Sequence, residues 1–292
     1  MRLPSVLVLA GHDPTGGAGL IADAESIRAM GAWPLTVATA LTRQTTVDVV
    51  SLTPRPFEEI VETARVLLED CGADAIKVGL IADKEALEAV VALCREYAHL
   101  PIVIDPVLKA GGGCELSDGA LIEAFVRGLL PLATLSTPNV AELFRLSAEE
   151  GAALDGGSDD AGRERAIERC ARALLSTGSG AMLVTGTDVP GRPGGDEVVH
   201  RLYRADAQHQ WRWPRLAGTF HGSGCTLSSA IAATLARGET LEHACEAAQR
   251  FTWQSLAGGL CQGRGQMLPD RLLRGRAPDA ADIETDQRGE RL

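Results

Sequence analysis

Residues 5–41 read SVLVLAGHDPTGGAGLIADAESIRAMGAWPLTVATAL, and this stretch decides the fold. Its apolar run 5–10 predicts a buried strand, the segment 18–31 a helix, and the run 35–41 a second strand. Strands that alternate with helices form a mainly parallel sheet with helices on both faces. The opening unit therefore predicts an α/β fold.

The same alternation continues along the chain. The segments 197–204 and 208–215 alternate apolar and polar residues, which is typical of an antiparallel pair at a sheet edge. We expect a single domain over residues 1–273, followed by a disordered tail over 274–292, because the tail is charged and nearly without large apolar residues. Further strands are predicted at 74–79, 101–105, 133–137 and 181–185, and further helices near 56–70, 84–98, 117–129, from about 139, and near 161–176, 224–237 and 241–258.

Composition limits the partners. The chain of 292 residues has a net charge of −11, from 28 basic and 39 acidic residues. Nucleic-acid surfaces need clustered Lys and Arg, so we expect no nucleic-acid partner. No apolar run approaches the roughly 20 residues that span a bilayer, so we expect no membrane segment, and the run at 5–10 is interpreted as a strand and not as a signal peptide. The seven cysteines are odd in number and lack paired metal-ligand spacing, which favours a reduced, cytoplasmic protein.

The chemistry-bearing residues follow the predicted strands. Ligands of open parallel sheets bind beyond the carboxyl ends of the strands. The turn GHDPTGGAG (11–19) follows the first strand, and its glycines let a ligand approach the backbone, although a plain strand-to-helix turn has the same composition. Asp105 ends the run 101–105, where its carboxylate can help to hold Mg²⁺ or form an Asx turn before Pro106.

Asn139 and Glu142 lie three residues apart at a predicted helix start, in STPNVAEL (136–143). With Asn139 as N-cap, Glu142 would reach back to complete a capping box. Pro138 prefers the first helical position, which would make Thr137 the cap and leave Glu142 to face a metal or phosphate. Both alternatives remain open.

Two further loops reach the same edge. Thr185 and Gly186, in LVTGTD (183–188), suit a nucleotide phosphate, although a plain turn looks the same. The glycine-rich loop KAGGGCELSD (109–118) predicts either a lid over a substrate or a flexible connection.

The segment HGSGC (221–225) begins the small-residue helix predicted at 224–237. A helix N-terminus has unpaired amides and a partial positive charge, so Gly222, Ser223 and Gly224 would form an anion hole for phosphate. The same field would favour the thiolate of Cys225, which could accept a proton from an attacking hydroxyl or orient it. A structural buried cysteine is the alternative, and the flanking glycines argue against it.

Several motifs together closely resemble the hydroxymethylpyrimidine and phosphomethylpyrimidine kinases of thiamine synthesis, in the ribokinase-like superfamily. The resemblance runs in order from about residue 5 to residue 258. It implies a three-layer α/β/α sandwich with a central, mostly parallel sheet, and a homodimer. It further implies transfer of phosphate from ATP, with Mg²⁺, to 4-amino-5-hydroxymethyl-2-methylpyrimidine and then to its monophosphate. The motifs are AGHDPTGGAGLIAD, TALTRQTT, IDPV, LSTPNVAEL, VTGTD and HGSGCTLSSAIAATLARG.

The resemblance also implies residue roles. Cys225 matches the position of the catalytic base of sugar kinases, behind an anion hole at Gly222–Gly224. Gln44 matches the residue that recognises the aminopyrimidine ring, which an amide suits because it donates and accepts at once. The remaining matches are Gly11, Asp13, Ala18 and Val107 for the substrate, and Asp105, Asn139 and Glu142 for the Mg²⁺ and phosphate region.

This chain departs from the family at a few positions. The family commonly has Thr in place of Ser223, Lys-Gly-Gly in place of residues 185–187 and a small residue in place of Arg43, and the segment 155–160 resembles a small insertion.

Three other functions are alternatives to this one. A kinase of a vitamin B6 alcohol would phosphorylate a similar hydroxymethyl group on an aromatic ring. A pyrimidine sensor would bind without turnover, but the retained Cys225 and Asp105 argue against it. A cysteine hydrolase would need a base near Cys225, where the sequence offers only His221 and no acidic partner for it.

Overall fold

The computed structural model describes residues 2–109, 117–148, 160–187 and 197–273. The predicted lid loop lies mostly outside these ranges, and the segment 155–160 does so except for residue 160. The predicted tail after residue 273 lies wholly outside them. Within the described ranges no helix is both long and apolar enough to cross a bilayer.

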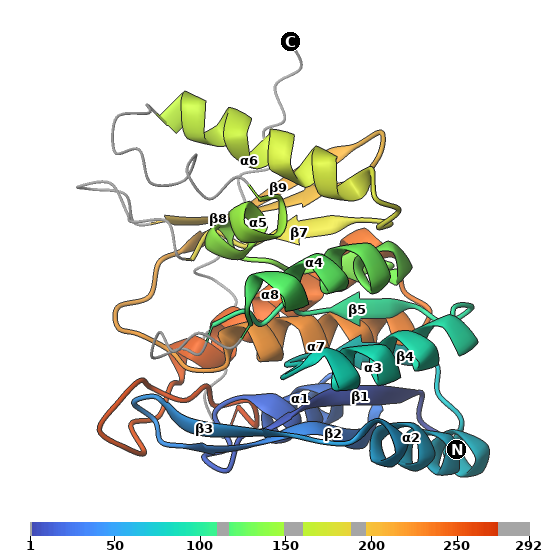
Figure 1. Ribbon diagram of the computed structural model, residues 1–292. Coiled ribbons are helices and arrows are strands. Elements are labelled where there is room, and N and C mark those ends of the chain that lie inside the picture. Colours follow the sequence, from blue (N-terminus) through green and yellow to red (C-terminus); the bar gives the residue numbers. More distant parts are fainter. Residues whose placement is uncertain (1, 110–116, 149–159, 188–196, 274–292) are drawn as a thin grey trace.

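One continuous sheet of nine strands runs through the described part of the chain, in the order β3-β2-β1-β4-β5-β6-β7-β8-β9 (Figure 1). Its centre, from β2 to β7, is parallel, and β8 and β9 form the antiparallel edge pair that the sequence predicts. The strands are β1 (Ser5–His12), β2 (Trp33–Gln44), β3 (Val49–Pro54), β4 (Ala75–Val78), β5 (Ile102–Ile104), β6 (Leu135–Ser136), β7 (Met182–Val184), β8 (Glu197–Tyr203) and β9 (Gln208–Pro214).

The opposite edge of the sheet differs from the expectation. Strand β3 pairs antiparallel with β2, and no strand was predicted there. The segment VVSLTP is short, and the turn before it, at 45–48, has neither Gly nor Pro to signal a hairpin. Strand β2 also extends three residues beyond the predicted run, which brings Gln44 to its carboxyl end.

Helices cover both faces of the sheet, so the predicted three-layer sandwich is confirmed (Figure 1). One face carries α2 (Phe57–Cys71), α3 (Lys84–Glu96), α4 (Gly119–Gly128), the short 3-10 helix η1 (Leu130–Leu132), α5 (Val140–Leu146) and α6 (Asp160–Leu175). The other face carries α1 (Gly19–Ala29), α7 (Ser223–Ala236) and α8 (Leu241–Ala257).

Strand β1 shows why the sequence folds in layers. Side chains alternate across a strand, so Leu7 and Leu9 pack into the core under α2 and α3, while Val6 and Val8 pack under α1 and α7. All four are fully buried, as expected for a parallel strand with helices on both faces. Full burial of each such side chain stabilises the fold by about 1.5–3 kcal/mol.

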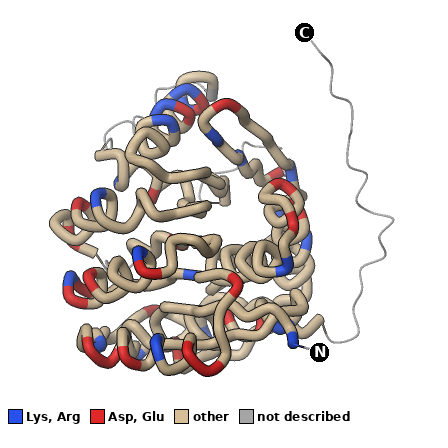
Figure 2. The backbone as a smooth tube through the Cα atoms, turned by 90° about the vertical axis from the view of Figure 1, so that its right-hand side faces the viewer, with Lys and Arg blue, Asp and Glu red and all other residues tan. Residues whose placement is uncertain are grey.

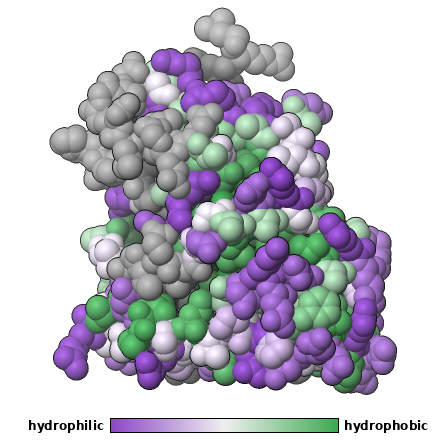
Figure 3. All heavy atoms as spheres, in the orientation of Figure 1, coloured by the Kyte–Doolittle hydropathy of each residue, from purple (hydrophilic) through white to green (hydrophobic). Residues whose placement is uncertain are grey.

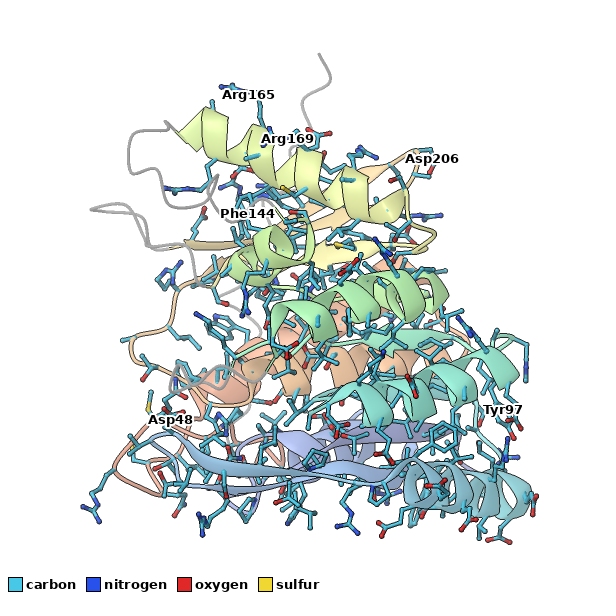
Figure 4. All side chains as sticks on the ribbon, in the orientation of Figure 1. Asp48, Tyr97, Phe144, Arg165, Arg169 and Asp206 are labelled. Carbon is cyan, nitrogen blue, oxygen red and sulfur yellow. The ribbon has the colours of Figure 1, made fainter. Side chains whose placement is uncertain are left out.

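The outer surface is polar. Phe144 of α5 points toward the sheet, whereas Arg165 and Arg169 of α6 point away from it (Figure 4). Acidic and basic positions are interspersed along the outer helices (Figure 2). The parallel strands all end at one side of the sheet, at the left in Figure 1, where the loops after β1, β2, β5, β6 and β7 meet the start of α7.

Candidate active site

A cavity of about 220 Å³ opens at the carboxyl ends of the parallel strands. Its walls contain every residue that the sequence analysis assigned to a site except Gly186. Segments as far apart in the chain as Gly11 and Cys225 therefore meet in one place. The assigned residues that line it are Gly11, Asp13, Ala18, Gln44, Asp105, Val107, Asn139, Glu142, Thr185, Gly222, Ser223, Gly224 and Cys225.

The start of α7 forms the predicted anion loop. The first hydrogen bond of the helix runs from the Thr226 amide to the Gly222 carbonyl (3.0 Å). The helix itself therefore leaves the amides of Ser223, Gly224 and Cys225 without an acceptor, beside the cavity. Aligned amides and the helix dipole favour an anion such as phosphate.

Gly222 cannot be replaced without moving the backbone. It has the left-handed conformation (φ 83°), and a Cβ there would lie 1.8 Å from the carbonyl oxygen of Gly17. The anion loop and the glycine turn after β1 are therefore in direct contact, and glycine is required at this contact.

Asp13 connects three parts of the site. Its carboxylate accepts hydrogen bonds from the Thr15 amide (2.8 Å), the Ala18 amide (2.9 Å) and His221 Nε2 (2.8 Å). Burial would raise the pKa of this carboxyl, but the hydrogen bonds from His221 and Thr15 outweigh it and hold the pKa well below its usual range. Asp13 is thus an anion that organises the turn and joins it to the anion loop.

Gln44 is oriented by the same carboxylate. Its side chain contributes to the low pKa of Asp13, and because an ionised carboxylate only accepts hydrogen bonds, the amide nitrogen of Gln44 is the group that suits this carboxylate. The carbonyl oxygen and the second N–H of Gln44 then remain for a ligand in the cavity that Gln44 lines. Such a donor–acceptor pair suits a planar heterocycle with an amino group.

The predicted thiolate of Cys225 is wrong for the site without ligands. Burial raises the pKa of this thiol to about 12, with further contributions from Asp23 and Asp105, while Lys77 and the Gly19 amide oppose the increase. Desolvation outweighs the groups that favour the thiolate. The thiol also contributes to lowering the pKa of Asp105, which lines the same cavity.

The raised pKa of Cys225 also argues against the cysteine hydrolase considered from the sequence. The structure does supply the acidic partner that the sequence did not reveal, because Asp13 binds His221. A nucleophilic cysteine needs a lowered pKa, however, and that of Cys225 is raised. The arrangement therefore does not support hydrolysis.

Asp105 lies at the end of β5 and is 5% exposed. Its carboxylate accepts a hydrogen bond from Ser228 Oγ (3.3 Å). Burial raises the pKa of Asp105, and Asp23 adds to the increase, while Lys77 opposes it. A carboxylate of this kind is stabilised by a cation close to it.

Asn139 and Glu142 form the capping box, and the alternative in which Thr137 caps α5 is wrong. Asn139 Oδ1 accepts from the Glu142 amide (2.8 Å), and Glu142 Oε2 accepts from the Asn139 amide (2.9 Å). Pro138 precedes the cap and does not begin the helix. Both capping residues nevertheless line the cavity.

Two charged residues of the site were missed. Lys77 of β4 lines the cavity and is paired with Asp23, and Arg271 binds the carbonyl oxygens of Gly16 and Gly17 and the Thr226 hydroxyl. A lysine inside the apolar run DAIKVG was a readable signal. Arg271 lies near the end of the predicted domain, where no sequence pattern marks it.

A second cavity, of about 320 Å³, adjoins the first. The two share Thr185, Thr187, Phe220, Ser223 and Gly224. Gly186 lies beside them, where a Cβ would come within 2.4 Å of the Val199 carbonyl, so it provides room for β8. The far end of the second cavity is lined by Val198, Trp213, Leu227, Trp253 and Leu256.

The fold and these adjoining cavities around an anion loop define the class, a ribokinase-like phosphotransferase. The structure of pyridoxal kinase from Staphylococcus aureus in complex with AMP-PCP superposes with a TM-score of 0.80 at 24% identity, covering 94% of this chain and 96% of that one. At that identity the likeness concerns the fold.

The sequence comparisons identify the family. The model of the family described as phosphomethylpyrimidine kinase matches residues 13–270, and the chain belongs to this family. A hydroxymethylpyrimidine/phosphomethylpyrimidine kinase of Streptomyces coelicolor is 33% identical over 263 residues, which is 90% of this chain and 92% of that protein. A bifunctional thiamine biosynthesis protein of Geobacter sulfurreducens is 34% identical over 270 residues, 92% of this chain, and the match spans only 52% of its length.

Proposed function

We propose that this protein phosphorylates 4-amino-5-hydroxymethyl-2-methylpyrimidine, and then its monophosphate, with ATP. The observation that carries the proposal is the single cavity that joins Gln44, oriented by Asp13, to the α7 amides and the Cys225 thiol. One end of it suits an aminopyrimidine ring and the other a phosphoryl group. The names of the relatives support the same reaction.

The chain's own residues supply positioning and charge stabilisation, which dominate phosphoryl transfer. The Gln44 amide binds the edge of the ring, and Val107 contributes an apolar wall. The hydroxymethyl group lies against Cys225, whose thiol orients the attacking oxygen. The amides of Ser223 and Gly224 stabilise the negative charge of the transferring group.

ATP occupies the second cavity in this proposal. Its phosphates extend over the anion loop, which both cavities share. Two buried polar atoms of that cavity, His200 Nδ1 and Thr252 Oγ1, have no hydrogen-bond partner among the described residues. Such atoms are rare in folded proteins unless a ligand or water satisfies them, and a nucleobase would do so.

Mg²⁺ is proposed as the metal of the reaction. The described residues contain no group of three or more His, Cys, Asp or Glu side chains arranged to hold a metal. This fits Mg²⁺, which is usually bound by one or two carboxylates together with substrate phosphates and water. Asp105 would hold it, together with Glu142, which lines the same cavity. When bound, it neutralises charge on the phosphates.

The test is ADP release from ATP and Mg²⁺ on addition of the pyrimidine, with pyridoxine and ribose as parallel substrates. Turnover with the pyrimidine at the highest kcat/KM supports the proposal, and analysis of the products by mass counts the phosphates transferred. Preference for pyridoxine would instead make the protein a vitamin B6 kinase. Binding of the pyrimidine without ADP release would make it a sensor.

Cysteine variants test the site directly. Cys225→Ala is expected to fold normally and to lower kcat by about 10²-fold or more, as for loss of a group that acts on the reacting atoms. Cys245→Ala removes another buried thiol, in α8, and is expected to leave kcat unchanged. Equal kcat for the two variants would remove Cys225 from the mechanism.

We also propose that the protein is a cytoplasmic homodimer. The six cysteines in the described ranges are free, which fits a reducing compartment. Exposed apolar side chains, namely Leu41, Val47 and Val50, gather on the β2–β3 hairpin at a sheet edge (Figure 3, lower left). Sedimentation of the wild type and of Val50→Lys tests the dimer, since a charge in this surface would separate the subunits.

A further inference from the structure

A buried ammonium group lies in the wall of the substrate cavity. Lys77 stands in the apolar strand β4 and its side chain is fully buried. The chain makes room for this side chain, because a Cβ at Gly79 would lie 2.7 Å from Lys77 Nζ. A lysine is rarely fully buried unless it is paired.

The partner of Lys77 lies in a helix that packs on the sheet, not in the sheet itself. Lys77 Nζ donates to Asp23 Oδ1 of α1 (2.9 Å), and the same oxygen accepts from Ser229 Oγ of α7 (2.7 Å). The second oxygen, Asp23 Oδ2, has no hydrogen-bond partner among the described residues. Three elements thus fix the position of one ammonium group.

Stability does not account for this pair. A buried ion pair loses the hydration of both ions, and apolar side chains of similar volume often stabilise a fold as well or better. The oxygen of Asp23 that lacks a hydrogen-bond partner among the described residues adds to that cost. The pair is therefore retained for another reason, and the surroundings of Lys77 indicate it.

Those surroundings are acidic and belong to the reaction site. Lys77 lines the same cavity as Asp105 and Cys225. Burial would lower the pKa of Lys77, but Asp23, Cys225 and Asp105 outweigh it and raise that pKa, so the ammonium keeps its charge. A lysine in that state is neither base nor nucleophile, and it acts as a permanent cation.

We propose that Lys77 stabilises charge at the phosphoryl-transfer site: its ammonium, fixed by Asp23 and Ser229 in the cavity wall that also contains Asp105 and Cys225, offsets the negative charge that gathers there during transfer. The proposal rests on the proposed kinase function. Charge that develops mainly in the transition state affects kcat more than KM.

The test replaces the ion pair by an apolar pair. Lys77→Met combined with Asp23→Leu removes both partners of the ion pair, so neither is left buried without the other, and its unfolding temperature is expected to stay near that of the wild type. We expect kcat to fall by about 10²–10³-fold, with each KM within about threefold of the wild type. The matched control is Arg201→Met with Glu164→Leu, which removes an ion pair between β8 and α6 and is expected to keep kcat.

The outcomes separate the two proposals. If the wild type turns over the pyrimidine and the apolar pair keeps its kcat, the role of Lys77 is overturned and the kinase function stands. If the wild type turns over none of the three alcohols, both proposals are overturned. Should the apolar pair fail to fold, Lys77→Gln with Asp23→Asn is judged by the same kcat criterion. If neither double variant folds, the ion pair of Lys77 and Asp23 is structural, and the proposed role of Lys77 in phosphoryl transfer is overturned.

Discussion

The contact between the anion loop and the first glycine turn gives the sharpest prediction. Gly222, before α7, and Gly238, after it, have nearly the same left-handed conformation, with φ of 83° and 82°. Their surroundings differ, because a Cβ at Gly238 meets nothing within 4 Å, whereas one at Gly222 lies 1.8 Å from the Gly17 carbonyl oxygen. Replacement of each by alanine therefore separates backbone strain from displacement of the loop.

The magnitudes follow from these distances. The left-handed conformation costs alanine about 1–2 kcal/mol at either position. At Gly222 the two segments must also move at least 1.2 Å apart, from 1.8 Å to the 3.0 Å below which Cβ contacts are essentially never found. Overpacking of this kind adds about 1–3 kcal/mol. A shift of about 1 Å among positioning groups can lower the rate about 10²-fold.

Urea unfolding and ADP release measure the two effects. Gly238→Ala is expected to lose about 1–2 kcal/mol of unfolding free energy and to keep its kcat/KM. Gly222→Ala is expected to lose about 2–5 kcal/mol and about 10²-fold or more in kcat/KM. Turnover by Gly222→Ala at the level of Gly238→Ala would refute the argument that this contact positions the anion loop.

Three further predictions concern the surroundings of the site. Arg271→Met removes a buried guanidinium that makes four hydrogen bonds, and it should lower both kcat and the unfolding free energy, the latter by about 3–5 kcal/mol. Arg201→Met, the control, should destabilise the fold and keep kcat. Urea unfolding measures the stability of both variants, and ADP release measures their kcat. Gln44→Leu should raise the Kd of the pyrimidine about tenfold or more in calorimetry and leave that of ATP unchanged; equal weakening of both would contradict its assignment. Burial lowers the pKa of His200 to about 4 in the folded protein, whereas an unperturbed histidine has a pKa of about 6.5. As the pH decreases from about 6.5 to 4, His200 is therefore protonated in the unfolded chain but not in the folded one, and the stability of the fold decreases. His200→Gln should reduce that slope in urea unfolding, while the exposed His209→Gln should keep it.

The architecture could be predicted because its signals are local. Alternating apolar runs and helical segments gave the central strands and the helices within a few residues. Strand β3 was missed because its six residues become a strand only by pairing with β2. The capping box of Asn139 and Glu142 was one of two alternatives open from the sequence, and the extended backbone of Asn139 and its hydrogen bonds with Glu142 decided between them.

The residues that line the cavity could be predicted from the sequence, but the pKa values of their ionisable groups could not. Glycine turns and a helix start predict where a phosphate binds, because they present amides through backbone geometry alone. The pKa of Cys225 depends on burial and on carboxylates at 23 and 105, far away in the chain. The field of the helix was visible in the sequence, and the larger desolvation was not.

The sequence by itself determined the order of the helices and of the strands other than β3, the side of the sheet at which the candidate site lies, and the anion loop. The tertiary structure decided the pairings that give these parts their chemistry, namely Asp13 with His221, Lys77 with Asp23, and Arg271 with the glycine turn. The physical reason is the range of the forces. Backbone periodicity and helix capping act over a few neighbouring residues, whereas burial and charge interactions depend on whichever distant segments the fold brings within a few ångströms.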